Sequence, residues 1–247
     1  MFGANQLGAN EATVWLMGLD GDFAHASALA VGLLDEGERA RAERFRDERA
    51  RGQFVAGRVL LRRMLAAYGG ADAAAWRFRA DALGKLHLDG EAPAFVFNLS
   101  HTYGLVACAL ARRGELGLDV EQVRISDDLV AVARHMFSAV EADHIGALAG
   151  EARAEAFFAY WTLKEAYLKA RGFGLSLDTK SFAFNLAETV SVSFTASAQD
   201  DGARWRFARL APTPGARLAV AAAAPLDLSG LAPRWIALED CFDAGRR

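Results

Sequence analysis

Residues 157–172 read FFAYWTLKEAYLKARG, a stretch rich in aromatic and aliphatic residues that ends at Gly172. Trp161, Glu165 and Lys169 are spaced i, i+4 and i+8, so a helix places their side chains along one stripe. A glutamate four residues before a lysine is also an ordinary helix-stabilising pair, worth about 0.2–0.5 kcal/mol. The surrounding aromatic residues predict a buried helix, however, and charges on a buried helix need partners.

Residues 116–121 read LGLDVE and predict a strand. Because strand side chains alternate between faces, Asp119 and Glu121 share one face. Neighbouring carboxylates repel each other unless a cation lies between them, and Mg²⁺ prefers oxygen ligands of this kind. We expect an acid from the helix, Glu165, to complete a metal site with these two. A solvated strand edge is the alternative, and the spacing alone favours neither.

A polar cluster, NLSH at 98–101, follows the apolar residues FVF at 95–97. Polar groups at the end of a buried strand are typical of active sites, although a single histidine such as His101 is more often structural. Ser100 and His101 are too close in sequence to form a nucleophile–base pair by themselves. The chain also lacks the G-x-S-x-G motif of serine hydrolases.

The stretch 38–63 holds nine arginines and only four acids. Some of these arginines belong to solvated helix faces. A local excess of guanidinium groups also suits a phosphate-bearing ligand, which arginine binds bidentately. Neither a GxxxxGK[ST] loop nor a GxGxxG fingerprint is present, so P-loop and Rossmann nucleotide sites are not indicated.

Composition narrows the class of protein. The 247 residues are 53% hydrophobic with a formal net charge of −3, which favours a folded protein and argues against a nucleic-acid binder. Two distant cysteines, Cys108 and Cys241, exclude a disulfide scaffold, and scattered histidines argue against a Cys/His metal site. Without a basic leader or an apolar run of about 18–20 residues, we expect a soluble cytoplasmic protein that does not bind membranes.

Helices and strands are predicted in both halves of the chain. Helical residues are expected at 33–68, ending at Gly69-Gly70, and at 126–171, with interruptions around 137–138 and at Gly150. Strands are expected at 13–17, 76–89, 95–99, 116–121, 177–184, 190–195, 205–210 and 217–223, whereas 105–111 fits a strand or the start of a buried helix. With a boundary at the charged turn 112–115, we predict an α+β fold of two small subdomains, 1–113 and 114–247.

Four motifs occur in a fixed order: FNLSH at 97–101, LGLDVE at 116–121, FSAVEADHI at 137–145 and WTLKEAYLKARGFGLSL at 161–177. Together they resemble the 4′-phosphopantetheinyl transferases of the broad-specificity, surfactin-synthetase-activating type, over about residues 41–184. The combination of G-[IL]-D-x-E with W-x-x-K-E-x-x-x-K is highly specific. GRVLLRRMLA at 57–66 and Gly84-Lys85 also fit the family's N-terminal half.

The resemblance implies an enzyme that moves the phosphopantetheine arm of coenzyme A onto a serine of an apo acyl carrier protein, or of a peptidyl or aryl carrier domain. The other product is adenosine 3′,5′-bisphosphate, and the cofactor is Mg²⁺. The implied architecture is a monomer built as a pseudo-dimer of two similar α+β halves, with coenzyme A in the cleft between them. Residues 1–113 then bind the nucleotide, and 114–247 carry the metal and catalytic residues.

The resemblance also assigns the catalytic roles by position. Asp119, Glu121 and Glu165 hold Mg²⁺ against the pyrophosphate. Glu165 is in addition the base for the carrier serine, directly or through a metal-bound water, and Lys169 stabilises or protonates the leaving phosphate. Lys164 either contacts the pyrophosphate or is structural.

The remaining coenzyme A contacts are implied in the N-terminal half. Ser100 and His101 contact the phosphates, with His101 also a catalytic candidate, and Lys85 contacts the adenine nucleotide end. The candidates for the 3′-phosphate are Arg41, which ranks first, Arg44, Arg51 and Arg58.

Some features depart from the family pattern. SHTYG at 100–104 replaces a commoner SHSG-like turn, Leu86 follows Lys85 where proline is frequent, and the tail after Ala224 matches nothing. The carrier is expected to dock around Val123–Phe137. Two alternatives stay open: a non-catalytic module of the same fold that binds coenzyme A or the carrier, and a different metal-dependent phosphotransferase.

Overall fold

The structure, a computed structural model, describes residues 6–19, 30–82, 84–90, 95–172, 177–196, 198 and 200–241. It is a mixed α+β fold, as predicted. The described residues divide into two compact units. Unit 1 takes those up to Arg113 together with the tail from Leu231, and unit 2 runs from Gly114 to Gly230.

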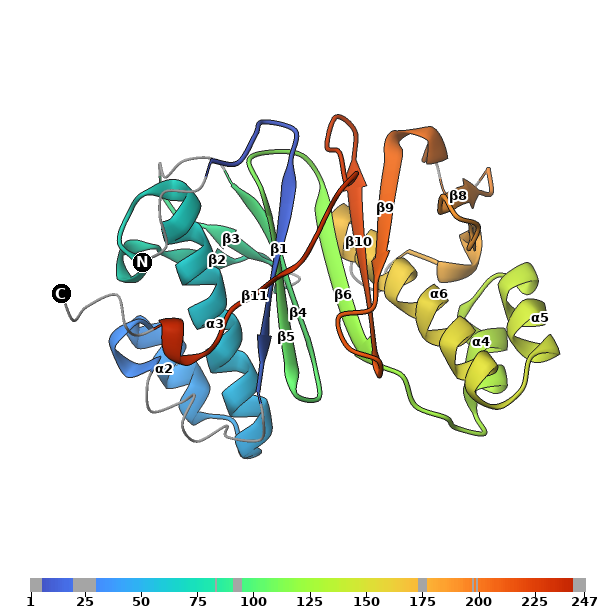
Figure 1. The fold of residues 1–247 in the computed structure, drawn as a ribbon, viewed down its shortest axis with the longest axis horizontal. Coiled ribbons are helices and arrows are strands. Elements are labelled where there is room, and N and C mark those ends of the chain that lie inside the picture. Colours follow the sequence, from blue (N-terminus) through green and yellow to red (C-terminus); the bar gives the residue numbers. More distant parts are fainter. Residues whose placement is uncertain are drawn as a thin grey trace. The chain divides into compact units, whose positions relative to one another are not determined.

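Unit 1 is built on a sheet with the strand order β11–β1–β5–β4. The strands are β1 (Ala12–Gly18), β4 (Val96–Thr102), β5 (Leu105–Ala111) and β11 (Arg234–Trp235). Neighbours β1, β5 and β4 are antiparallel, so 105–111 is a strand. The long helix of the unit lies along this sheet (Figure 1) and buries Leu60, Leu61 and Met64 against Trp15 and Cys108.

Residues 33–68, predicted as one helical region, form two α-helices. They are α2 (Glu36–Glu43) and α3 (Glu48–Gly69). Asp35 and Asp47 cap their N-termini, and because a capping residue has an extended backbone, Asp47 separates the second helix from the first. The predicted end of the region is confirmed: Gly70 has a φ of +76°, which a residue without a Cβ adopts readily.

The predicted extended region 76–89 forms a small hairpin. It consists of β2 (Phe78–Ala80) and β3 (Leu86–Leu88). Short 3₁₀ helices of the described chain lie at Ala30–Gly32, Ala73–Ala75, Thr179–Ser181, Gly202–Arg204 and Glu239–Cys241. Over the described residues, no helix combines the length and apolar character needed to cross a membrane.

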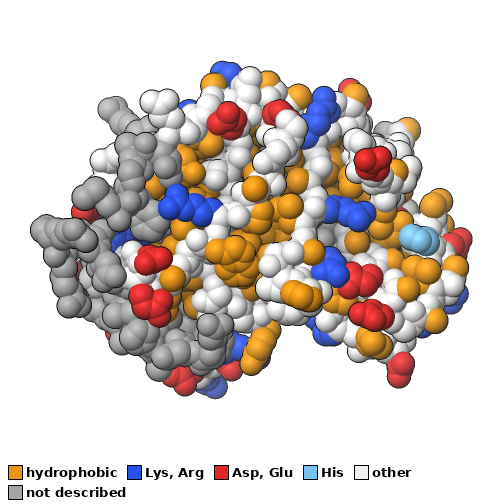
Figure 2. Space-filling view, in the orientation of Figure 1, with side chains coloured by type: hydrophobic (Ala, Val, Ile, Leu, Met, Phe, Trp, Pro, Cys, Tyr) orange, Lys and Arg blue, Asp and Glu red, His pale blue; other side chains and the backbone are white. Residues whose placement is uncertain are grey.

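Unit 2 is built on an antiparallel sheet with the order β6–β10–β9. The strands are β6 (Leu116–Gln122), β9 (Trp205–Leu210) and β10 (Ala216–Ala223). Helix α6 (Gly150–Arg171) packs along β6 and β10 (Figure 1). It buries Phe157, Phe158 and Tyr167 in the core of the unit, so the prediction of a buried helix is confirmed. Charged side chains of both signs and hydrophobic ones are interspersed over α6 and β9 in Figure 2.

Smaller elements complete the described part of unit 2. They are α4 (Leu129–Met136), α5 (Ala139–Ala147), β7 (Phe182–Asn185) and β8 (Ser191–Phe194). The predicted interruptions of the helical region are confirmed, because Ser138 forms a capping box with Glu141 at the start of α5 and α6 begins at Gly150. The predicted strand 177–184 is shorter than expected, since Thr179–Ser181 are helical.

The end of the described chain returns to unit 1. Strand β11 pairs in parallel with β1. The next residue, Ile236, donates its backbone N–H to Leu16 O over 2.8 Å and is buried in the core of unit 1. We predicted that the C-terminal subdomain runs from 114 to 247, but the tail from Leu231 belongs to unit 1.

Candidate active site

Helix α6 approaches strand β6 closely at Gly117. A Cβ on Gly117 would lie 2.0 Å from the carbonyl oxygen of Ala166 and 2.4 Å from the backbone nitrogen of Ala170. Only glycine therefore allows this helix–strand distance. Since side chains alternate along β6, Asp119 and Glu121 point to the same face as Gly117, towards α6.

This close packing brings together three of the predicted residues. Lys169 Nζ donates to Asp119 Oδ1 over 2.6 Å, and Asp119 is only 4% exposed. Glu165 lies within electrostatic range of both. Burial and the negative charge of Asp119 raise the pKa of Glu165, and the positive charge of Lys169 opposes that rise. A carboxylate of raised pKa beside an ammonium group is suited to proton transfer.

The third predicted acid, Glu121, lies two residues further along the same face of β6. It is half-buried and stands opposite Arg217 in the β6–β10 register. Arg217 Nε in turn donates to Glu155 Oε2 on α6 over 2.6 Å. Within the residues that the structure describes, no three Asp, Glu, His or Cys side chains already stand as a set of metal ligands.

Lys164, the residue before Glu165, lies in the interior of unit 2. Its ammonium group is 2.9 Å from Glu141 Oε2 and donates to Thr179 O and Phe182 O over 2.8 Å each. Burial lowers the pKa of Lys164, and Glu141 opposes this shift. Because the three ammonium protons have partners inside the unit, these contacts favour the structural alternative for Lys164 over a contact with the pyrophosphate.

Replacing Lys164 with methionine should destabilise unit 2 strongly. Glu141 is fully buried, so the variant leaves its charge without a cation, at a cost of about 3–5 kcal/mol. Adding Glu141→Gln should recover part of the loss. Urea denaturation of both variants tests this, with the exposed Lys180→Met as control, expected within about 0.5 kcal/mol of wild type. Equal stability of Lys164→Met and wild type would contradict the structural role.

The C-terminal turn of α6, next to Lys169, is held by Asp200. Its carboxylate accepts hydrogen bonds from Tyr167 Oη over 2.7 Å and Trp205 Nε1 over 3.1 Å, and it forms an ion pair with Arg171. Burial alone raises the pKa of Asp200. The hydrogen bonds and the charge of Arg171 outweigh burial, so the pKa lies below its usual value.

Asp200→Asn should therefore lower stability at neutral pH by about 1–2 kcal/mol. Because the pKa of Asp200 is lower in the folded than in the unfolded chain, its contribution is complete above the unfolded-state value, about 3.9. It disappears as the pH falls through the lower folded-state value. Thermal unfolding of wild type and Asp200→Asn from pH 7 to pH 3 should show that the stability difference between them becomes smaller as the pH falls. A stability difference that stays constant in acid would rule out the charge of Asp200 as its cause. The exposed Asp143→Asn serves as control.

Ser100 and His101 lie next to each other on β4 and point to opposite faces of the sheet. Ser100 is buried opposite Ala107 of β5, whereas His101 is exposed opposite Val106. The turn that departs from the family pattern contains Gly104, whose φ is +69°. The two predicted phosphate contacts are thus at the end of one hairpin, but their side chains do not converge.

Lys85 lies at the end of the β2–β3 turn and is half-buried. Its backbone N–H donates to Asp81 Oδ1 over 2.9 Å, and Asp81 Oδ2 is 2.9 Å from His87 Nε2. Asp81 therefore shapes the turn at which Lys85 sits, where the family pattern has a proline after the lysine.

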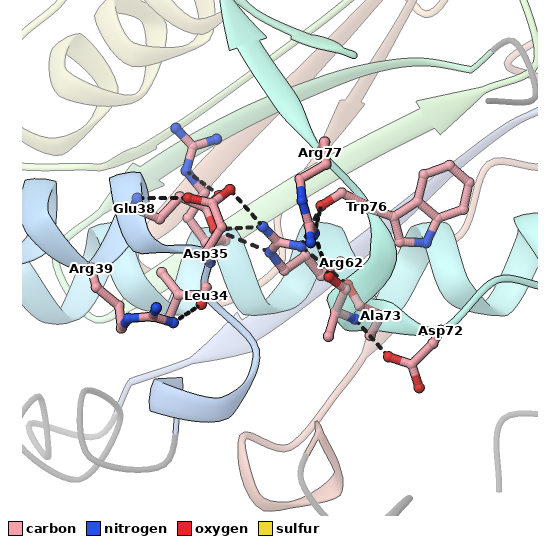
Figure 3. A network of polar contacts seen from close by, with 11 residues as sticks. Leu34, Asp35, Glu38, Arg39, Arg62, Asp72, Ala73, Trp76 and Arg77 are labelled. Atoms are coloured by element: carbon pink, nitrogen blue, oxygen red, sulfur yellow. Dashed lines mark hydrogen bonds and ion pairs between the residues drawn. The ribbon is translucent and has the colours of Figure 1, made fainter. Parts of the chain in front are cut away.

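Among the arginines of 38–63, Arg62 is a structural residue (Figure 3). It is fully buried, and its guanidinium donates to Glu38 Oε2 over 2.6 Å and to Trp76 O over 2.7 Å. It also forms an ion pair with Asp35 at 3.3 Å. These partners join α2, α3 and the segment before β2, which explains part of the arginine excess without any ligand.

Two of the four candidate arginines gather around Phe54. Arg41, which is exposed, lies 5.3 Å from the ring centroid of Phe54, and Arg58, which is buried, lies 5.1 Å from it. Arg58 is also 3.5 Å from Glu38. Burial lowers the pKa of Arg58, and the charge of Arg41 adds to this effect. The two positive charges of Arg41 and Arg58, both beside the ring of Phe54, favour the binding of an anion.

The other two candidates make only local contacts. Arg44 is exposed and donates to Ala40 O over 3.4 Å. Arg51 is half-buried and donates to Phe45 O over 3.0 Å. Neither contact orients the guanidinium group so that it could bind the same phosphate as Arg41.

Sequence reasoning missed three residues that support the site. Gly117 precedes the acid pair on the same strand face, and Glu141 ends an S-x-x-E capping signal, so both left a trace in the sequence. Asp200 left none, because its partners Tyr167 and Trp205 come from separate elements.

Comparison with known proteins agrees with the motifs. Residues 115–223 match the model of the 4′-phosphopantetheinyl transferase superfamily. The chain is 34% identical over 170 residues to the 4′-phosphopantetheinyl transferase HetI of Nostoc sp., covering 68% of this chain and 71% of HetI. It is 27% identical over 188 residues to Sfp of Bacillus subtilis, covering 76% and 81%. Identity to AcpT of Salmonella typhimurium is 34% over 145 residues, covering 57% and 68%.

The superfamily match spans both β6, with its acid pair, and α6, with Glu165 and Lys169. The family resemblance predicted from the four motifs is confirmed, and this chain belongs to the 4′-phosphopantetheinyl transferase superfamily.

Proposed function

We propose that the chain transfers the 4′-phosphopantetheine arm of coenzyme A to a serine of an apo carrier protein and releases adenosine 3′,5′-bisphosphate. The observation that carries this proposal is the group of Asp119, Glu165 and Lys169, which α6 and β6 bring together inside the span that matches the family. The relatives named as 4′-phosphopantetheinyl transferases support it.

In the proposed reaction, the serine Oγ attacks the phosphorus that carries the pantetheine arm. Glu165, whose raised pKa favours accepting a proton, takes the hydroxyl proton. The bond from this phosphorus to the bridging oxygen then breaks. Lys169, held by Asp119, donates a hydrogen bond or its proton to the departing phosphate of adenosine 3′,5′-bisphosphate.

We propose that Asp119, Glu121 and Glu165 hold Mg²⁺. The donor set fits this cation because carboxylate oxygens are its preferred ligands, and because Asp119 and Glu165 repel each other unless a cation relieves the repulsion. When bound, Mg²⁺ supplies positive charge against the pyrophosphate. Asp119→Ala should raise the Mg²⁺ concentration needed for half-maximal transfer and lower activity together. Lost activity with unchanged Mg²⁺ binding in calorimetry would refute the ligand role.

For the nucleotide end of coenzyme A we propose residues of unit 1. Arg41 and Arg58 are the favoured contacts of the 3′-phosphate, since both guanidinium groups adjoin Phe54. Arg44, Arg51, Lys85, Ser100 and His101 remain candidates. A pseudo-dimer of two similar halves is part of this proposal: each unit packs a 22-residue helix on a sheet that contains three antiparallel strands.

We propose that the carrier docks around Val123–Phe137. This segment contains Ile125, a large hydrophobic side chain that is 69% exposed, and Val140 in the following helix is 74% exposed. An apolar surface of this kind suits a protein partner. That the chain is monomeric and cytoplasmic stays a prediction.

The deciding experiment combines the protein, coenzyme A, MgCl₂ and each of several apo carriers from fatty acid, polyketide and peptide pathways, and then measures carrier mass. The expected result is a mass gain of one phosphopantetheine arm that requires both coenzyme A and Mg²⁺. Binding of coenzyme A without a mass gain on any carrier would instead identify a non-catalytic module.

A further inference from the structure

Unit 2 contains a cavity of about 300 Å³ that the proposed reaction does not use. It lies between α6, strands β9 and β10, and Leu186 after β7. From α6 it is lined by Glu155, Ala159 and Thr162, which are spaced i, i+4 and i+7. Thr162 is followed at i+3 and i+7 by Glu165 and Lys169, and Arg217 stands opposite Glu121, so the cavity borders the acid cluster, although none of the three predicted metal ligands lines it.

Among the described residues, the cavity carries one positive charge that no acid neutralises. Arg217 is already held by both carboxylate oxygens of Glu155, over 2.6 and 2.5 Å. Arg209, on the edge strand β9, is exposed at the cavity and forms no ion pair within the described chain. Its charge acts on Tyr160, whose hydroxyl is 2.9 Å from His144 Nδ1.

The rest of the lining is mostly apolar. Leu186 and Ala159 are half-buried at the cavity, and Leu210 and Leu218 come from the two strands. Thr162 donates its hydroxyl proton to Phe158 O over 2.8 Å, so it offers a ligand only acceptor capacity. A ligand that contacts both Arg209 and the apolar lining needs one negative charge and an apolar body.

We propose that this cavity binds a small organic monoanion, of the chemical class of short-chain carboxylates, with its carboxylate on Arg209 and its chain against Leu186 and Ala159. Guanidinium pairs bidentately with a carboxylate. An exposed ion pair contributes little by itself, so the apolar wall must supply the remaining affinity.

The test is isothermal titration calorimetry of the full chain with sodium hexanoate. We expect saturable binding with a Kd of about 1 mM, the range of a ligand this small. Arg209→Gln should weaken it about threefold to fivefold, the range for loss of an exposed ion pair. Arg206→Gln, on the same strand but on its other face, is the matched control and should bind as wild type.

Further titrations distinguish this cavity from nonspecific apolar binding and from the coenzyme A site. Hexanol, with the same chain and no charge, should not bind measurably, and Ala159→Leu, which fills the cavity, should abolish hexanoate binding while thermal unfolding confirms that the variant folds. Saturating coenzyme A should leave hexanoate binding unchanged. Wild-type affinity in Arg209→Gln, absence of binding to the wild type, or complete displacement by coenzyme A would each overturn the proposal.

Discussion

Replacing Glu165 with glutamine is expected to reduce transfer to a carrier by at least about a thousandfold, within the usual range for loss of a general base. The amide keeps the shape of the side chain but accepts no proton. The fold should survive, because Glu165 is half-buried and its charge is disfavoured by burial and by Asp119. Carrier mass measured over time gives the rate, and thermal unfolding gives the stability.

The matched control is Glu151→Gln, an exposed glutamate at the start of the same helix, which should transfer at the wild-type rate. If the thermal midpoint of Glu165→Gln is equal to or above that of the wild type, the fold is intact and the loss of transfer comes from the missing base. Near-normal turnover would remove Glu165 from both of its proposed roles, as base and as metal ligand.

Replacing Gly117 with alanine should both destabilise unit 2 and abolish transfer. The added Cβ would sit 2.0 Å from the backbone oxygen of Ala166, and a backbone atom cannot rotate away as a side chain does. Helix α6 or strand β6 must shift, which costs about 3 kcal/mol or more, the upper part of the range for overpacking. The shift also separates Asp119 from Lys169.

Gly146→Ala is the matched control for this variant. Gly146 lies in α5 with no atom within 4 Å of an added Cβ, so alanine should stabilise the chain by about 0.5–1 kcal/mol. Urea denaturation compares the two. A midpoint of Gly117→Ala equal to that of the wild type would show that α6 does not need its close approach to β6.

Periodicity along single elements predicted much of the fold. The i, i+4, i+8 spacing of Trp161, Glu165 and Lys169 predicted one stripe of α6, and the alternation in LGLDVE predicted one face of β6. Both are local properties, since 3.6 residues per helical turn and two per strand repeat hold wherever an element forms. The interruptions at Ser138 and Gly150 are local for the same reason.

Lys164 shows where local patterns are insufficient. It directly precedes Glu165, and both belong to a helix with aromatic residues on several sides. The position of Lys164 in the sequence therefore did not determine whether its side chain faces the core. The buried acid Glu141 and the carbonyls of Thr179 and Phe182 determine it, and all three come from other elements. The same holds for Arg62, whose partners lie up to 27 residues away.

The sequence by itself determined the family, the mixed α+β class and the residue types of the candidate site, because motifs and periodicity are properties of short segments. Only the tertiary structure decided which charges meet. Asp119 and Lys169 are 50 residues apart, and their 2.6 Å contact depends on a glycine that lets two backbones touch. The tail belongs to unit 1 because the two residues of β11 pair with the edge of β1. Two residues are too few to form a recognisable sequence pattern. Contacts of this kind depend on packing between distant segments, which no local pattern encodes.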